Sequence, residues 1–120
     1  METVKANELR LGNWLRNPHT NEDKQATVET VSDIQNGFMQ RIGIPLTEDI
    51  LVRLGFEEQM FGTIKTDAYK KGIITVHLIS GNTGECQIAL YNKLLPIFYN
   101  YVHELQNLAY DLRQELTLNP

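Results

Sequence analysis

Only one cysteine, Cys86, occurs among the 120 residues of this chain. A lone cysteine excludes an intrachain disulfide framework and any zinc site built from several cysteines. The apolar runs are also short, because the longest of them, such as 72–79 and 94–98, fall far below the roughly 20 residues that a bilayer span requires. Residues 1–8 lack the apolar stretch of a secretory signal. We therefore expect a cytoplasmic protein with no membrane segment.

Negative charge outweighs positive charge in this sequence. The chain carries 11 Lys and Arg against 15 Asp and Glu, which gives a formal net charge of −4 and a pI near 5.3. Binding to nucleic acid depends on clustered basic residues that displace counterions from the phosphate backbone. The one basic group, Lys65 with Lys70 and Lys71, is small and lies beside Asp67. The charge balance therefore weighs against a nucleic-acid partner.

The remaining composition is that of an ordinary folded domain. Hydrophobic residues make up 42% and charged residues 22%, both close to the averages for soluble globular domains. A chain of this length suffices for one hydrophobic core. We expect residues 1–120 to form a single α+β domain.

The first 44 residues predict a small barrel-like β-meander. Residues 9–16 indicate a first strand, and the polar residues 17–25 indicate a hairpin loop. Residues 27–34 are rich in β-branched side chains, which favours a second strand. Asn36-Gly37 is typical of a two-residue hairpin turn, and residues 38–44 would then form a third strand.

The middle of the chain predicts a short helix and a central hairpin. Thr47 is placed to cap a helix whose first turn is acidic and which ends at Gly55. Residues 56–66 indicate a weak strand pair. The clearest β pattern is the pair of alternating runs 73–79 and 85–91, whose apolar residues share one face.

Residues 101–116 predict an amphipathic helix. Its apolar residues recur at steps of three and four, which places them on one stripe of a 3.6-residue helix. We expect this stripe to pack on the sheet. It consists of Val102, Leu105, Leu108, Ala109, Leu112 and Leu116.

No motif for catalysis, a metal or a cofactor emerges. His103 begins a segment spaced like the zinc-protease helix motif, but Asn107 stands where the second histidine ligand is required. The loop 81–84 joins two predicted strands and lacks the lysine of a P-loop. Cys86 lies at an inward-facing strand position, where packing is the expected role. We expect no enzymatic activity, no cofactor and no metal.

Three polar residues of the last helix are the candidates for partner binding. His103, Asn107 and Tyr110 lie at steps of four and three along the helix, so they share one stripe. Such a row offers hydrogen-bond donors and acceptors without net charge, which suits a protein surface. The same residues would equally serve to satisfy neighbouring backbone groups within the fold. Both interpretations stay open.

Three segments of the chain resemble a family of small uncharacterised proteins of Bacteroidetes bacteria and their phages and prophages. They are Ala6-Asn-Glu-Leu-Arg-Leu-Gly-Asn13, the segment Ile44–Phe56 with its Ile-Pro-Leu-Thr-Glu start, and Tyr101-Val-His-Glu-Leu-Gln-Asn-Leu108. The last has Glu104 where the family has glutamine, and the family's Leu-Thr-Gly-Glu-Glu-Leu ending is absent. The resemblance implies a phage or mobile-element accessory protein, and it brings no established activity.

These observations favour a non-enzymatic binding protein that captures a host factor stoichiometrically. An alternative is a protein that sequesters a small nucleotide-like ligand, with Trp14, Tyr91, Tyr99 and Tyr101 stacking a base. The strand edges and the long amphipathic helix leave a homodimer open as well.

Overall fold

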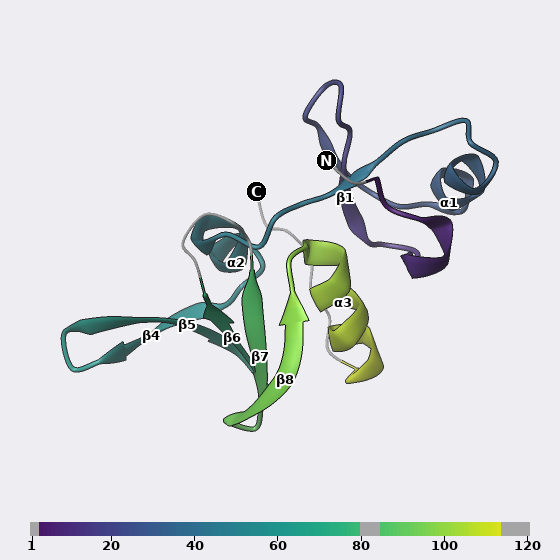
Figure 1. Ribbon diagram of the computed structural model, residues 1–120. Coiled ribbons are helices and arrows are strands. Elements are labelled where there is room, and N and C mark those ends of the chain that lie inside the picture. Colours follow the sequence, from purple (N-terminus) through teal and green to yellow (C-terminus); the bar gives the residue numbers. More distant parts are fainter. Residues whose placement is uncertain (1–2, 80–84, 114–120) are drawn as a thin grey trace. The chain divides into compact units, whose positions relative to one another are not determined.

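The computed structural model describes residues 3–79 and 85–113, which group into two compact units (Figure 1). The first unit comprises residues 3–44 and 101–113, and the second comprises residues 45–79 and 85–100. Antiparallel sheets of three and five strands and three α-helices make the described residues an α+β fold, as the sequence predicts. That the whole chain is a single domain stays a prediction.

The first unit contains a three-stranded antiparallel sheet in the order β2-β1-β3. β1 (Trp14–Arg16) and β2 (Asp23–Gln25) form a hairpin that ends in an ion pair of 2.8 Å between Arg16 and Asp23. β3 (Ile42–Gly43) pairs with the other side of β1. A short 3-10 helix, η1 (Ala6–Glu8), precedes the sheet. The three strands form an open sheet, and not a closed barrel.

The second strand predicted for residues 27–34 is wrong, because this segment forms helix α1 (Val28–Gln35). Thr27 caps the helix: its hydroxyl accepts from the Thr30 backbone N–H at 3.2 Å, and the Thr30 hydroxyl accepts from the Thr27 N–H at 3.2 Å. This reciprocal pairing satisfies two backbone donors at the helix start. Val31 and Ile34, three positions apart, then pack on a small core of Val4, Leu15 and Ala26.

The hairpin predicted at Asn36-Gly37 is likewise wrong, because these residues end α1. Gly37 adopts a φ of +77°, its N–H donates to the Ile34 carbonyl, and the Phe38 N–H donates to the Asp33 carbonyl. This is the Schellman arrangement, in which glycine takes the left-handed position after a helix. Phe38 is 82% exposed and lies outside any strand.

The second unit begins with α2 (Glu48–Arg53), which confirms the predicted helix. The Thr47 hydroxyl accepts from the Ile50 N–H at 3.4 Å, and Gly55 adopts the expected left-handed φ of +91°. Leu51 and Leu54 are fully buried. The cap, the acidic first turn and the terminating glycine all lie where the sequence places them.

Five strands follow in chain order, each antiparallel to the next (Figure 1). They are β4 (Glu57–Phe61), β5 (Ile64–Lys71), β6 (Ile74–Leu78), β7 (Cys86–Leu90) and β8 (Lys93–Tyr99). The central pair β6–β7 confirms the predicted hairpin, and its inward face carries the fully buried Ile74, Val76, Cys86 and Ile88. The connection at 80–84, including the segment compared with a P-loop, lies outside the described residues.

Strand β8 was not predicted from the sequence, and it contains Pro96. Proline is tolerated in a strand at the edge of a sheet, where its missing N–H costs no ladder hydrogen bond. β8 is such an edge strand. The turn that leads into it, Tyr91-Asn92, has φ values of +52° and +65° without a glycine.

Helix α3 (Val102–Asp111) belongs to the first unit and packs against β1. Val102, Leu105 and Ala109 are fully buried, which confirms the predicted apolar stripe over these positions. The helix ends at Asp111 and not at Leu116, because Arg113 adopts a left-handed φ of +57°. Leu116 itself lies outside the described residues.

Candidate binding surface

The first unit is held together by polar side chains that join α3 to the segment before β1. The Asn107 amide of α3 donates to the Glu8 carbonyl at 2.9 Å, and its oxygen accepts from the Asn13 amide at 3.0 Å. Asn13 in turn accepts from the Arg10 backbone N–H at 2.7 Å. The side chain of Asn107 is therefore committed to contacts within the fold on both its donor and its acceptor side.

Gln106, the neighbouring helix residue, makes a second set of these contacts. Its oxygen accepts from the Trp14 backbone N–H at 2.7 Å, and its amide nitrogen donates to the Gly12 carbonyl at 3.3 Å. Gln106 is only 8% exposed, so these backbone groups are satisfied away from water. The segments 6–13 and 101–108, at the two ends of the chain, are thus bonded to each other.

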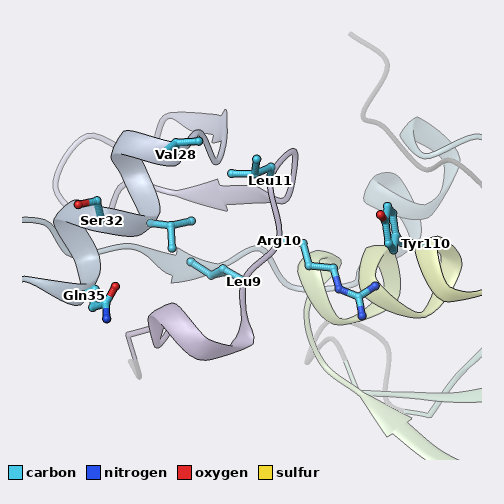
Figure 2. Close-up of a pocket in the computed structure, with 8 residues that line it drawn as sticks. Leu9, Arg10, Leu11, Val28, Ser32, Gln35 and Tyr110 are labelled. Carbon is cyan, nitrogen blue, oxygen red and sulfur yellow. The ribbon is translucent and has the colours of Figure 1, made fainter.

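Arg10 extends this connection toward the C-terminal end of α3. Its guanidinium forms an ion pair of 2.8 Å with Asp111 and donates to the Asn107 carbonyl at 3.1 Å. The same group lies over the Tyr110 ring, 4.8 Å from its centroid, which is a cation–π arrangement. Figure 2 shows the Arg10 side chain reaching from its own segment to Tyr110 on α3.

An open hollow of about 710 Å³ lies next to Arg10 in the first unit (Figure 2). Three of the side chains beside it are mainly exposed. Leu11 is 64% exposed, Val28 at the start of α1 is 68% exposed, and Tyr110 is 70% exposed. Large apolar side chains that are exposed together mark interaction sites in soluble proteins. We call this feature the hollow; its lining residues are Leu9, Arg10, Leu11, Val28, Val31, Ser32, Gln35 and Tyr110.

The three residues predicted to bind a partner have different surroundings. Tyr110 lines the hollow and is exposed, whereas His103 is 2% exposed and Asn107 is half-buried in its contacts with the preceding segment. Arg10, Leu11 and Val28 were not singled out from the sequence. Val28 in particular faces the hollow only because residues 28–35 are helical.

His103 is a buried imidazole on α3. Its ring stacks on that of Tyr101, with centroids 5.8 Å apart and planes 10° from parallel. Its Nδ1 has no hydrogen-bond partner among the described residues. Burial lowers the pKa of His103, and the nearby carboxylates of Glu104 and Glu8 only partly oppose this effect.

This lowered pKa predicts a loss of stability in mild acid. The unfolded chain takes up a proton at this histidine as the pH falls through about 6.5, whereas the folded chain does so only at lower pH. The free energy of unfolding should therefore fall as the pH is lowered from 7 to 5.5. Urea unfolding at several pH values measures the effect.

His103→Phe keeps an aromatic ring against Tyr101 and removes the titrating group. We expect this variant to lose most of the pH dependence between pH 7 and 5.5. His19→Gln, in the exposed loop between β1 and β2, is the matched control and should retain it. Equal pH dependence in all three proteins would show that His103 is not the group responsible.

Cys86 is buried in β7, and its thiol lies 3.8 Å from the Leu46 carbonyl, to which it donates. Burial raises the pKa of this thiol to about 12, so it is neutral at physiological pH. A packing role fits this environment. No group of three or more His, Cys, Asp or Glu that would hold a metal occurs within residues 3–79 and 85–113.

The aromatic residues suggested for stacking a base are divided between the two units. Trp14 and Tyr101 belong to the first unit, and Tyr91 and Tyr99 belong to the second. Tyr101 already stacks on His103, and Tyr91 is 77% exposed at the β7–β8 turn. Neither unit by itself brings the four rings together.

Comparison with known proteins found no matching family, no matching curated protein and no matching solved structure. Among the described residues, no helix has the length and apolar character needed to cross a bilayer.

Proposed function

We propose that this chain is a non-enzymatic accessory protein of phage or mobile-element origin that binds a host protein stoichiometrically through the hollow. The observation that carries the proposal is the group of three exposed apolar residues, Leu11, Val28 and Tyr110, around one concave surface. The family resemblance of the chain supports a host factor as the partner.

The chemistry of the hollow favours an apolar protein segment as its occupant. Its lining contains the aliphatic side chains of Leu9 and Val31, and beside Arg10 it contains the uncharged polar residues Ser32 and Gln35. Aromatic residues and arginine are enriched at protein interfaces, where they combine apolar area with hydrogen bonding. Tyr110 and Arg10 supply this combination at the α3 side.

A nucleotide-like ligand fits the hollow less well. Arg10 is the one cationic residue among the described residues that line it, and Asp111 already balances that charge at 2.8 Å. A phosphate group entering the hollow would therefore meet an arginine whose charge is already balanced. The hollow instead suits an uncharged side chain that leaves the Arg10–Asp111 pair in place.

The double substitution Leu11→Ser with Val28→Ser tests this proposal. Both residues are mainly exposed, so the melting temperature should stay close to that of the wild type. Affinity capture from a Bacteroidetes lysate, with mass spectrometry to identify and count the bound protein, should give a 1:1 partner for the wild type. Titration of the purified partner should show at least a tenfold loss of affinity in the double variant, about 1.4 kcal/mol.

Phe38→Ser is the matched control, because Phe38 is 82% exposed in the same unit but does not line the hollow. It should bind the partner like the wild type. Equal binding by the double variant and the wild type would overturn the use of the hollow. A ligand-dependent thermal shift with nucleotides, together with no protein partner, would instead favour the small-ligand function.

A further inference from the structure

The outward face of the five-stranded sheet in the second unit carries a separate small cavity. Thr75 of β6 lies in register with Lys70 of β5 on one side and Ala89 of β7 on the other. Ala68 and His77 form the next cross-strand pair on the same face. The small side chains of Ala68, Thr75 and Ala89 leave a cavity of about 270 Å³, below the volume that holds a drug-sized ligand.

Most of the polar side chains that line this cavity are unpaired within the protein. Lys70, Thr75, His77 and Asn92 have no hydrogen bond or ion pair from their side chains to any other part of the chain that the structure describes. Thr75 gives the strongest indication of a bound group. This residue is 7% exposed, and its buried hydroxyl has no hydrogen-bond partner among the described residues. A buried hydroxyl with no partner is costly, which points to a group that binds there.

The β7–β8 turn supplies the Asn92 side chain. Leu90 pairs with Lys93, so Tyr91 and Asn92 form a two-residue hairpin loop, and their left-handed φ values of +52° and +65° are those that a type I′ turn requires. This turn places the Asn92 amide at the cavity.

The charges around the cavity indicate the kind of ligand. Each unpaired group can donate a hydrogen bond: an ammonium, a hydroxyl, an imidazole and an amide. Within the part of the chain that the structure describes, no carboxylate lines the cavity. Glu57 lies in register with Lys70, but it is exposed and forms no ion pair with it. Gln59, the remaining polar member, donates to the Glu57 backbone carbonyl at 3.0 Å.

We propose that this cavity binds a small oxyanion, a carboxylate or a phosphate, whose oxygens accept hydrogen bonds from Lys70, Thr75, His77 and Asn92. The size of the cavity limits the ligand to a small molecule or to one anionic group of a larger one. This site belongs to the second unit and is independent of the hollow in the first.

Nuclear magnetic resonance titration of the full chain with sodium phosphate, and separately with sodium acetate, tests the proposal. Sodium chloride at equal ionic strength is the reference. We expect saturable amide shifts centred on Thr75 and Ala89 for at least one oxyanion, and the responding anion identifies the class. Lys70→Gln should weaken this binding about tenfold, because charge-assisted hydrogen bonds are the stronger ones. Thr75→Val should weaken it about fivefold through the loss of one hydrogen bond.

Two controls keep the result interpretable. Lys93→Gln removes a lysine of β8 that does not line the cavity, and it should leave the affinity unchanged. Thr75→Val should raise the melting temperature of the free protein by roughly 4 °C, because it removes a buried hydroxyl without a partner. Binding to neither oxyanion, equal weakening by Lys93→Gln, or a lower melting temperature in Thr75→Val would each overturn the proposal.

Discussion

Gly43→Ala is expected to lower the free energy of unfolding by about 3 kcal/mol, because the added methyl group would overlap the Tyr101 ring. A Cβ at this position would lie 2.6 Å from Tyr101 Cδ1 and 2.9 Å from its Cβ, closer than real Cβ contacts. Gly43 belongs to β3, which is only two residues long, so a shift of its backbone would break the pairing with β1. Urea unfolding followed by circular dichroism measures the change.

The Tyr101 ring also stacks on the imidazole of the buried His103, so a shift of the ring would disturb that contact. The expected loss in the free energy of unfolding is therefore at the upper end of the range for an overpacked site. Tyr101→Gly provides the test of mechanism, because it removes both the ring and the Cβ that lie against Gly43. In that background Gly43→Ala should cost much less, and the difference between the two costs is the interaction energy of the pair. Equal costs in both backgrounds would show that the methyl group clashes elsewhere or not at all.

The parts of the fold that were predicted correctly are those with local and regular signals. Thr47, Gly55 and the acidic residues between them define α2 within nine positions of the chain. The alternation in 73–79 and 85–91 fixes one inward face for both strands, which the burial of Val76 and Ile88 confirms. These patterns depend on near neighbours, so the sequence alone reveals them.

The helix at 28–35 was misread because composition and capping gave opposite indications. Its β-branched residues Val28, Thr30 and Val31 favour a strand by propensity. The structure follows the hydrogen bonds of Thr27 and Thr30 instead, together with the burial of Val31 and Ile34 on one side. Thr27 as a cap and Gly37 as a helix end are the sequence features that indicate α1.

The candidate surface was harder to predict, because its contacts join residues far apart in the sequence. Arg10 and Asn107 are separated by 97 positions, and Glu8 and Asn107 by 99. No periodicity in either segment indicates such a pairing. The amphipathic pattern correctly identified α3, and it placed Tyr110 on the polar side, but it did not distinguish Tyr110 from the internally bonded Asn107.

The two proposals assign separate tasks to the two units. The hollow of the first unit offers exposed apolar side chains and a neutralised arginine, whereas the cavity of the second is lined by hydrogen-bond donors that are unpaired among the described residues. An apolar protein segment suits the hollow, and a small oxyanion suits the cavity. Each proposal is tested by substitutions in one unit only, so the failure of one leaves the other standing.

Gln106→Leu should lower the free energy of unfolding by about 2 kcal/mol, because it leaves the Trp14 backbone N–H without its acceptor at a buried site. The Gly12 carbonyl also loses a donor but keeps the amide of Gln25 at 3.3 Å, so the Trp14 group accounts for most of the loss. Urea unfolding should show a lower midpoint with an unchanged slope. The matched control is Gln40→Leu, an exposed glutamine of the same unit, which should be within 0.5 kcal/mol of the wild type. If Gln106→Leu were equally neutral, the segment before β1 would depend on Asn107 and the Arg10–Asp111 pair for its position beside α3.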